Sequence, residues 1–77
     1  MSARYVMTLN NYLQGIGGNE ASTLSWEEST SGPPHALIWF VVCKIRGQPY
    51  GSASASQKMA AKEEAARQAL IRLGIPV

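Results

Sequence analysis

Lys58 and Lys62 are the residues whose type and spacing most clearly suggest binding chemistry. In the stretch QKMAAKEEAARQALIRL, residues 57–73, apolar side chains recur at helical spacing and form one stripe. The stripe contains Ala65, Ala66, Ala69, Leu70 and Leu73. Toward the start of the helix it continues into Lys62 and then Lys58, which lie four residues apart and are therefore neighbours on the helix surface. If the first turns of this helix extend past the edge of the sheet below it, both ammonium groups project beside a helix N-terminus, where anions are stabilised.

A phosphate backbone would suit such a pair of lysines, because its charges are closely spaced and need no deep pocket. Ser54 and Ser56, just before the helix, could add hydrogen-bond donors. The alternative is that both lysines are solvated side chains, with stems along apolar surface and ammonium groups in water. Helical spacing alone does not separate these two interpretations.

Composition bounds the class of protein. The chain has 77 residues, a formal net charge of +2 and a pI near 9.0, which fits one small domain with a mild basic bias. Four of the seven basic residues lie in the last twenty positions, so the C-terminal helix is expected to be the basic element. Cys43 is the only cysteine and lies in an apolar run, so we expect a buried thiol and no disulfide.

Catalytic and metal sites are not expected. One cysteine and one histidine cannot close a zinc site, and the chain shows neither paired carboxylates at useful spacing nor a Ser/His/Asp set. We therefore expect no cofactor and no enzymatic activity. The longest apolar run, residues 36–43, is too short to cross a bilayer, and no signal-like segment opens the chain. The expected location is intracellular, cytoplasmic or nuclear, without a membrane partner.

The elements that would position these residues follow from hydrophobic periodicity. We expect a helix at 5–16, strands at 22–28, 36–45 and 50–56, and a last helix at 57–73 that ends at Gly74. Turns are expected at 29–35 and 46–49. This α-β-β-β-α order predicts an α+β fold: a three-stranded antiparallel sheet with two helices packed on one face. The domain should cover residues 5–74, with flexible ends at 1–4 and 75–77.

Several short motifs occur together in order. They are LNNYLQ at 9–14, GPPH at 32–35 followed by Trp39, YG at 50–51, and KMAAKEEAARQAL at 58–70. With these motifs the chain resembles the double-stranded RNA-binding domain family over about residues 5–74. The resemblance implies binding of double-stranded RNA by shape, with the first helix in one minor groove and the GPPH loop in the next. The lysines would then contact phosphates across the intervening major groove.

The resemblance implies specific contact residues. They are Thr8, Asn11 and Gln14 on the first helix, Pro33, Pro34 and His35 in the loop, and Lys58 and Lys62 on the last helix. His35 is expected both to orient the loop and to lie near the minor groove. Asn11 stands where the family often has glutamate, and Met59 replaces a middle lysine, so affinity should be lower than with a full motif. Ser56 is expected to cap the last helix in place of Gln57.

The central strand raises a second hypothesis. The resemblance places Trp39 on the inner face of the sheet, and alternation then places Val41, Cys43 and Ile45 there too. The opposite alternation places Ile38, Phe40 and Val42 on the face that no helix covers. These three could form a protein-interaction or homodimer surface, or could be ordinary surface residues covered by neighbours such as Tyr50 or Glu27. The alternative function is accordingly a protein-interaction or dimerisation module on the same fold, with weak or no RNA binding.

Overall fold

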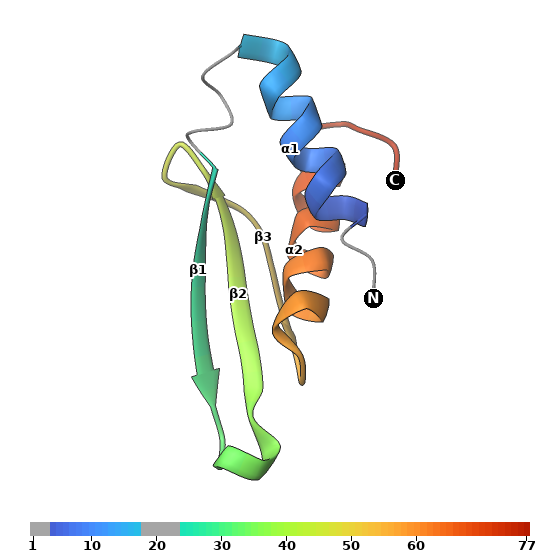
Figure 1. The fold of residues 1–77 in the computed structure, drawn as a ribbon. Helices are drawn as coiled ribbons and strands as arrows, with labels where there is room; N and C mark the ends of the chain where they lie inside the picture. The colour runs from blue at the N-terminus through green and yellow to red at the C-terminus, as the bar shows by residue number, and fades with distance from the viewer. Residues whose placement is uncertain (1–3, 18–23) are drawn as a thin grey trace.

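Three strands pair in chain order and carry both helices on one side (Figure 1). The computed structural model describes residues 4–17 and 24–77. The elements are α1 (Arg4–Gly17), β1 (Leu24–Ser31), a short 3-10 helix η2 (Pro34–Ala36), β2 (Ile38–Ile45), β3 (Gln48–Ala55) and α2 (Lys58–Arg72). Both strand pairs are antiparallel. The predicted α+β fold with α-β-β-β-α order is confirmed.

The core lies between the sheet and the helices. α2 packs against β2 and β3, and α1 packs on α2. The fully buried apolar residues are Leu9 and Leu13 of α1, Val41, Cys43 and Ile45 of β2, and Ala61, Ala65, Ala66, Ala69 and Leu70 of α2. The predicted alternation along β2 is thus confirmed, and burial raises the pKa of the Cys43 thiol to about 11. That thiol is a buried apolar group, as expected.

Gly51 allows α2 to lie directly on β3. A Cβ atom added at Gly51 would be 2.2 Å from the carbonyl oxygen of Ala65 and 3.0 Å from the nitrogen of Ala69. The alanine-rich face of α2 therefore approaches the main chain of the strand itself. This close approach gives the YG motif a physical reason, since only glycine leaves room for the helix.

Several strand boundaries differ from the prediction. β2 begins at Ile38 and not at 36, because Pro34–Ala36 form η2, and β3 ends at Ala55 and not at 56. β1 continues to Ser31, beyond the expected end at 28, because its serine and threonine residues pair with β2 up to Ile38. The tight turn contains only Arg46 and Gly47, with φ values of 54° and 77°, as a two-residue hairpin turn requires. β3 consequently begins at Gln48, and the register shifts between Cys43 and Lys44.

The chain ends are only partly described. Residues 1–3, part of the predicted flexible N-terminus, and 22–23, the predicted start of β1, lie outside the described residues. At the other end α2 ends at Arg72, one residue before the predicted 73, and the predicted terminator Gly74 has φ 82°. The amide of Ile75 donates to the carbonyl of Leu70 at 2.9 Å. Within residues 4–17 and 24–77 no helix combines the length and apolar character needed to span a membrane.

Candidate nucleic-acid interface

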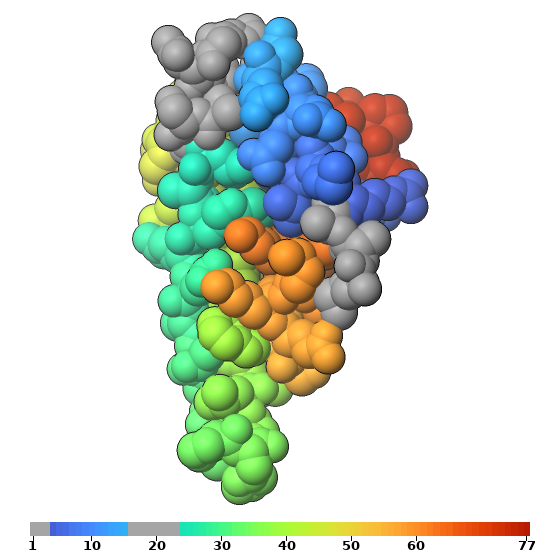
Figure 2. All heavy atoms as spheres, in the orientation of Figure 1, coloured from blue at the N-terminus to red at the C-terminus, as the bar shows by residue number. Residues whose placement is uncertain are grey.

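Three segments far apart in the sequence share one long face of the molecule. Figure 2 shows α1 in blue at the top, the first turns of α2 in orange in the middle, and the segment around η2 in green at the bottom. The longest dimension of the molecule is 42 Å, against 23 Å and 17 Å across. The three predicted contact segments therefore lie along the length of the molecule, in the order α1, α2, η2.

α1 presents an exposed polar stripe. Thr8, Asn11 and Gln14 are all exposed. The Thr8 hydroxyl donates to the carbonyl of Arg4 at 2.8 Å. The side-chain amides of Asn11 and Gln14 make no hydrogen bond within the described residues. Helical spacing places Met7 on the same stripe, and 61% of its surface is exposed. Met7 was not among the expected contact residues, which were all polar on this helix, although its position on the stripe is visible from its spacing.

The N-terminus of α1 is held by a carboxylate from α2. Glu63 Oε2 accepts a hydrogen bond from the amide of Tyr5, and Oε1 accepts one from the amide of Val6, both at 2.9 Å. These amides belong to the first turn of α1, where no intrahelical acceptor exists and negative charge is stabilised. Glu63 therefore fixes the position of α1 on α2, a role that its place in a charged helical run did not reveal.

The GPPH loop takes its shape from main-chain geometry. Gly32 has φ 95°, and a Cβ atom there would be 2.8 Å from the carbonyl oxygen of Ala36. The amide of Ala36 donates to the carbonyl of Pro33 at 2.9 Å and closes the turn. Pro33, Pro34 and His35 are exposed. The His35 ring makes no hydrogen bond to the described part of the chain, so its expected orienting role finds no support, and the ring is free to contact a partner.

The expected overhang of α2 is wrong, because the sheet extends past the helix. Figure 1 shows β1 and β2 continuing below the first turn of α2 to η2. The reason is geometric, since a strand rises about 3.3 Å per residue against about 1.5 Å in a helix. Both lysines consequently lie over tryptophan rings of the inner sheet face. Lys58 Nζ is 5.6 Å from the ring centroid of Trp39, and Lys62 Nζ is 4.9 Å from that of Trp26.

The two lysines differ in their charged neighbours. Lys58 Nζ lies 3.0 Å from Glu28 Oε1, and its side chain is 48% exposed. Lys62 has no carboxylate partner within the described residues. The first turn of α2 contains no acidic residue. Its N-cap residue is Gln57, and neither the Gln57 nor the Ser56 side chain accepts a hydrogen bond from the free amides of this turn. The expected Ser56 cap is therefore wrong.

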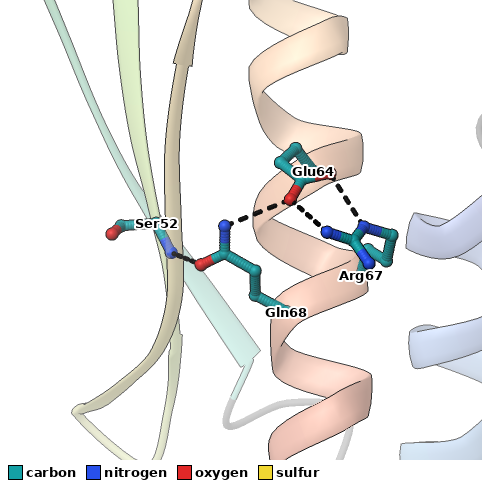
Figure 3. Close-up of polar contacts among 4 residues, drawn as sticks. All are labelled: Ser52, Glu64, Arg67 and Gln68. Atoms are coloured by element: carbon teal, nitrogen blue, oxygen red, sulfur yellow. Dashed lines mark hydrogen bonds and ion pairs between the residues drawn. The ribbon is translucent and has the colours of Figure 1, made fainter.

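The C-terminal half of α2 uses its polar side chains within the fold. Arg67 donates two hydrogen bonds to Glu64, at 2.9 and 2.7 Å, and Gln68 bridges Glu64 to the amide of Ser52 (Figure 3). Hydrogen bonds from Arg67 and then Gln68 lower the pKa of Glu64. Arg72 donates to the carbonyl of Pro49 at 3.3 Å. This half of the helix therefore packs along β3. The Arg67 guanidinium is paired with the Glu64 carboxylate.

The outer face of the sheet carries an apolar row. Ile38 and Phe40 are 43% and 46% exposed, while Val42 is half-buried. A shallow groove of about 410 Å³ runs beside Phe40 and Val42, with Glu27 and Ser29 on its other side. Tyr50 packs against the core cluster, so it does not cover this row. No group of three or more potential metal ligands occurs in the part of the chain that the structure describes.

Comparison with known proteins gives one family match. The family model described as double-stranded RNA binding motif matches residues 5–73. This range contains α1 except Arg4, the whole sheet and all of α2. A comparison with curated proteins gave no significant match.

Proposed function

The chain belongs to the double-stranded RNA-binding motif family, and we propose that it binds RNA duplexes by shape through three contacts. In this proposal α1 lies in one minor groove, the loop at residues 32–36 lies in the next, and the start of α2 faces the phosphates between them. Such an arrangement covers about 16 bp and depends on A-form geometry with little dependence on sequence.

The single observation that carries this proposal is the placement of the three segments along one elongated face (Figure 2). Asn11 and Gln14 keep amide donors and acceptors free on α1, which suit 2′-hydroxyl groups and base edges. Pro33, Pro34 and His35, all exposed, offer contacts from the loop at the other end of this face. Minor grooves of an RNA duplex display 2′-hydroxyl groups, so this chemistry distinguishes RNA from DNA.

Lys58 and Lys62 supply the proposed phosphate contacts between the two grooves. Their ammonium groups lie over the rings of Trp39 and Trp26, at 5.6 and 4.9 Å from the ring centroids, on the side of α2 that faces the sheet. The helix N-terminus adds partial positive charge at the same place. The proposal includes no catalytic step; it is supported by the family match to a binding motif. The alternative of an interaction module without RNA binding is not favoured, because the family match covers every RNA-contact segment.

The test is a titration of the chain with a ~20 bp RNA duplex, long enough for the ~16 bp footprint, with matched duplex DNA and single-stranded RNA. We expect the RNA duplex to bind most tightly. Equal affinity for duplex DNA would contradict the 2′-hydroxyl contacts.

A pair of double variants tests the phosphate contacts. Lys58→Gln with Lys62→Gln removes both positive charges and should weaken binding at least about tenfold and reduce the log–log salt slope by about 2. Lys44→Gln with Arg72→Gln removes the same charge elsewhere and should retain most of the affinity. Equal losses in both variants would show that only net charge matters.

A further inference from the structure

Glu28 is a carboxylate on the side of the sheet where the helices pack. β1 pairs with β2 so that Trp26 lies opposite Cys43 and Glu28 lies opposite the buried Val41. Side chains two residues apart share a face, so Glu28 points to the same side as Trp26. It is the one acid on this side of β1, since the pattern places Glu27 on the outer face opposite Val42.

The Glu28 carboxylate occupies a position that suits a phosphate. Its Oε1 atom is 3.0 Å from Lys58 Nζ, and its side chain is 28% exposed. Lys58 is the first residue of α2, where helix geometry stabilises negative charge and where no acidic side chain or cap from α2 itself is present. The Lys58 ammonium is thus held between the Trp39 ring and a carboxylate, close against the sheet.

We propose that Glu28 is an intramolecular competitor for the phosphate that Lys58 binds, and so lowers the affinity of the domain for RNA duplexes. This inference rests on the proposed function. A phosphate that approaches Lys58 must displace Glu28 from its ammonium group, whereas Lys62 has no carboxylate partner within the described residues. The two lysines therefore contribute unequally to RNA affinity, and the ion pair of Lys58 with Glu28 causes this difference.

The chain offers a matched control in the neighbouring residue. Glu27 and Glu28 are adjacent, identical and each paired with one lysine, but Glu27 bonds Lys44 at 2.6 Å on the outer face. Glu28→Gln and Glu27→Gln change the net charge equally and differ only in which lysine they release. A gain in RNA affinity that occurs with Glu28→Gln but not with Glu27→Gln is therefore caused by the release of Lys58.

The experiment measures the dissociation constant for a ~20 bp RNA duplex across a salt series, using fluorescence anisotropy. We expect Glu28→Gln to bind about two- to fivefold tighter at low salt, with a salt slope steeper by up to about 0.9. Glu27→Gln should change the affinity by less than about twofold. In a Lys58→Gln background the gain from Glu28→Gln should disappear.

Three outcomes would overturn the inference. If the wild type binds but Glu28→Gln binds like Glu27→Gln, Glu28 is no competitor and the proposed function stands. The same conclusion follows if the gain persists without Lys58. If the wild type and both variants all fail to bind the duplex, the proposed function fails and this inference fails with it. Thermal melts check folding, and Glu28→Thr, a β-branched neutral residue, serves if the Gln variant unfolds.

Discussion

Lys58 and Lys62 carry the same charge in different surroundings. Each ammonium group lies over a tryptophan ring of the inner sheet face, Lys58 over Trp39 and Lys62 over Trp26. Only Lys58 has a carboxylate within the described residues, namely Glu28. Spacing on α2 therefore makes the lysines equivalent, whereas their contacts with β1 and β2 make them different.

Single substitutions should separate the two lysines. We expect Lys62→Gln to weaken binding of an RNA duplex by about three- to tenfold and to lower the salt slope by about 1. Lys58→Gln should weaken binding less, because Glu28 already competes for the Lys58 ammonium in the wild type and reduces the phosphate contact that is lost. Anisotropy titrations at several salt concentrations measure both effects. A larger loss with Lys58→Gln than with Lys62→Gln would contradict this ranking.

Sequence periodicity identified these lysines but not their partners. The stripe on α2 is local information, visible at spacings of three and four residues. The contacts with Trp26, Glu28 and Trp39 join residues about twenty to forty positions apart, and they depend on strand register and on where α2 begins along the sheet. The same holds for Glu63, whose carboxylate caps another helix. Such partners follow only from the assembled layers.

At the scale of elements, the sequence was informative where local signals agree. The β-branched run of β2, the glycine that ends α2 and the amphipathic pattern of α1 all pointed to the observed elements. It failed at the end of β1, where serine and threonine residues resemble loop composition but pair with β2. It also placed α2 beyond the sheet, because the relative lengths of strands and helices were not compared.

The contact between α2 and β3 leads to a stability prediction. Gly51→Ala should lower the free energy of unfolding by about 2–3 kcal/mol or more, since the new methyl group would clash with the Ala65 carbonyl 2.2 Å away. Gly15→Ala is the control, because nothing lies within 4 Å of a Cβ atom there. That helical substitution should stabilise the fold by about 0.5–1 kcal/mol. Urea denaturation measures both, and a neutral Gly51→Ala would show that α2 does not need this close approach.

At the scale of the whole molecule, the two faces of the sheet have different chemistry. The inner face carries the core and, beyond it, the tryptophan–lysine contacts proposed to face RNA. The outer face carries serine residues around the apolar row Ile38, Phe40 and Val42. Because the row lies on the opposite side of the sheet from α1 and α2, RNA binding and contact through this row would not exclude each other.

Self-association through the outer face remains a prediction. Exposed apolar rows of this kind often mark contact surfaces, because the solvent-facing positions of a strand are normally polar. We expect the wild type to self-associate as its concentration is raised, and Phe40→Ser with Val42→Thr to stay monomeric, as measured by light scattering or sedimentation. Ile71→Ser is the control, since it removes a 50% exposed apolar side chain from α2 and leaves the row intact. If the wild type stays monomeric at high concentration, Ile38, Phe40 and Val42 are ordinary surface residues, as the alternative interpretation of the sequence holds.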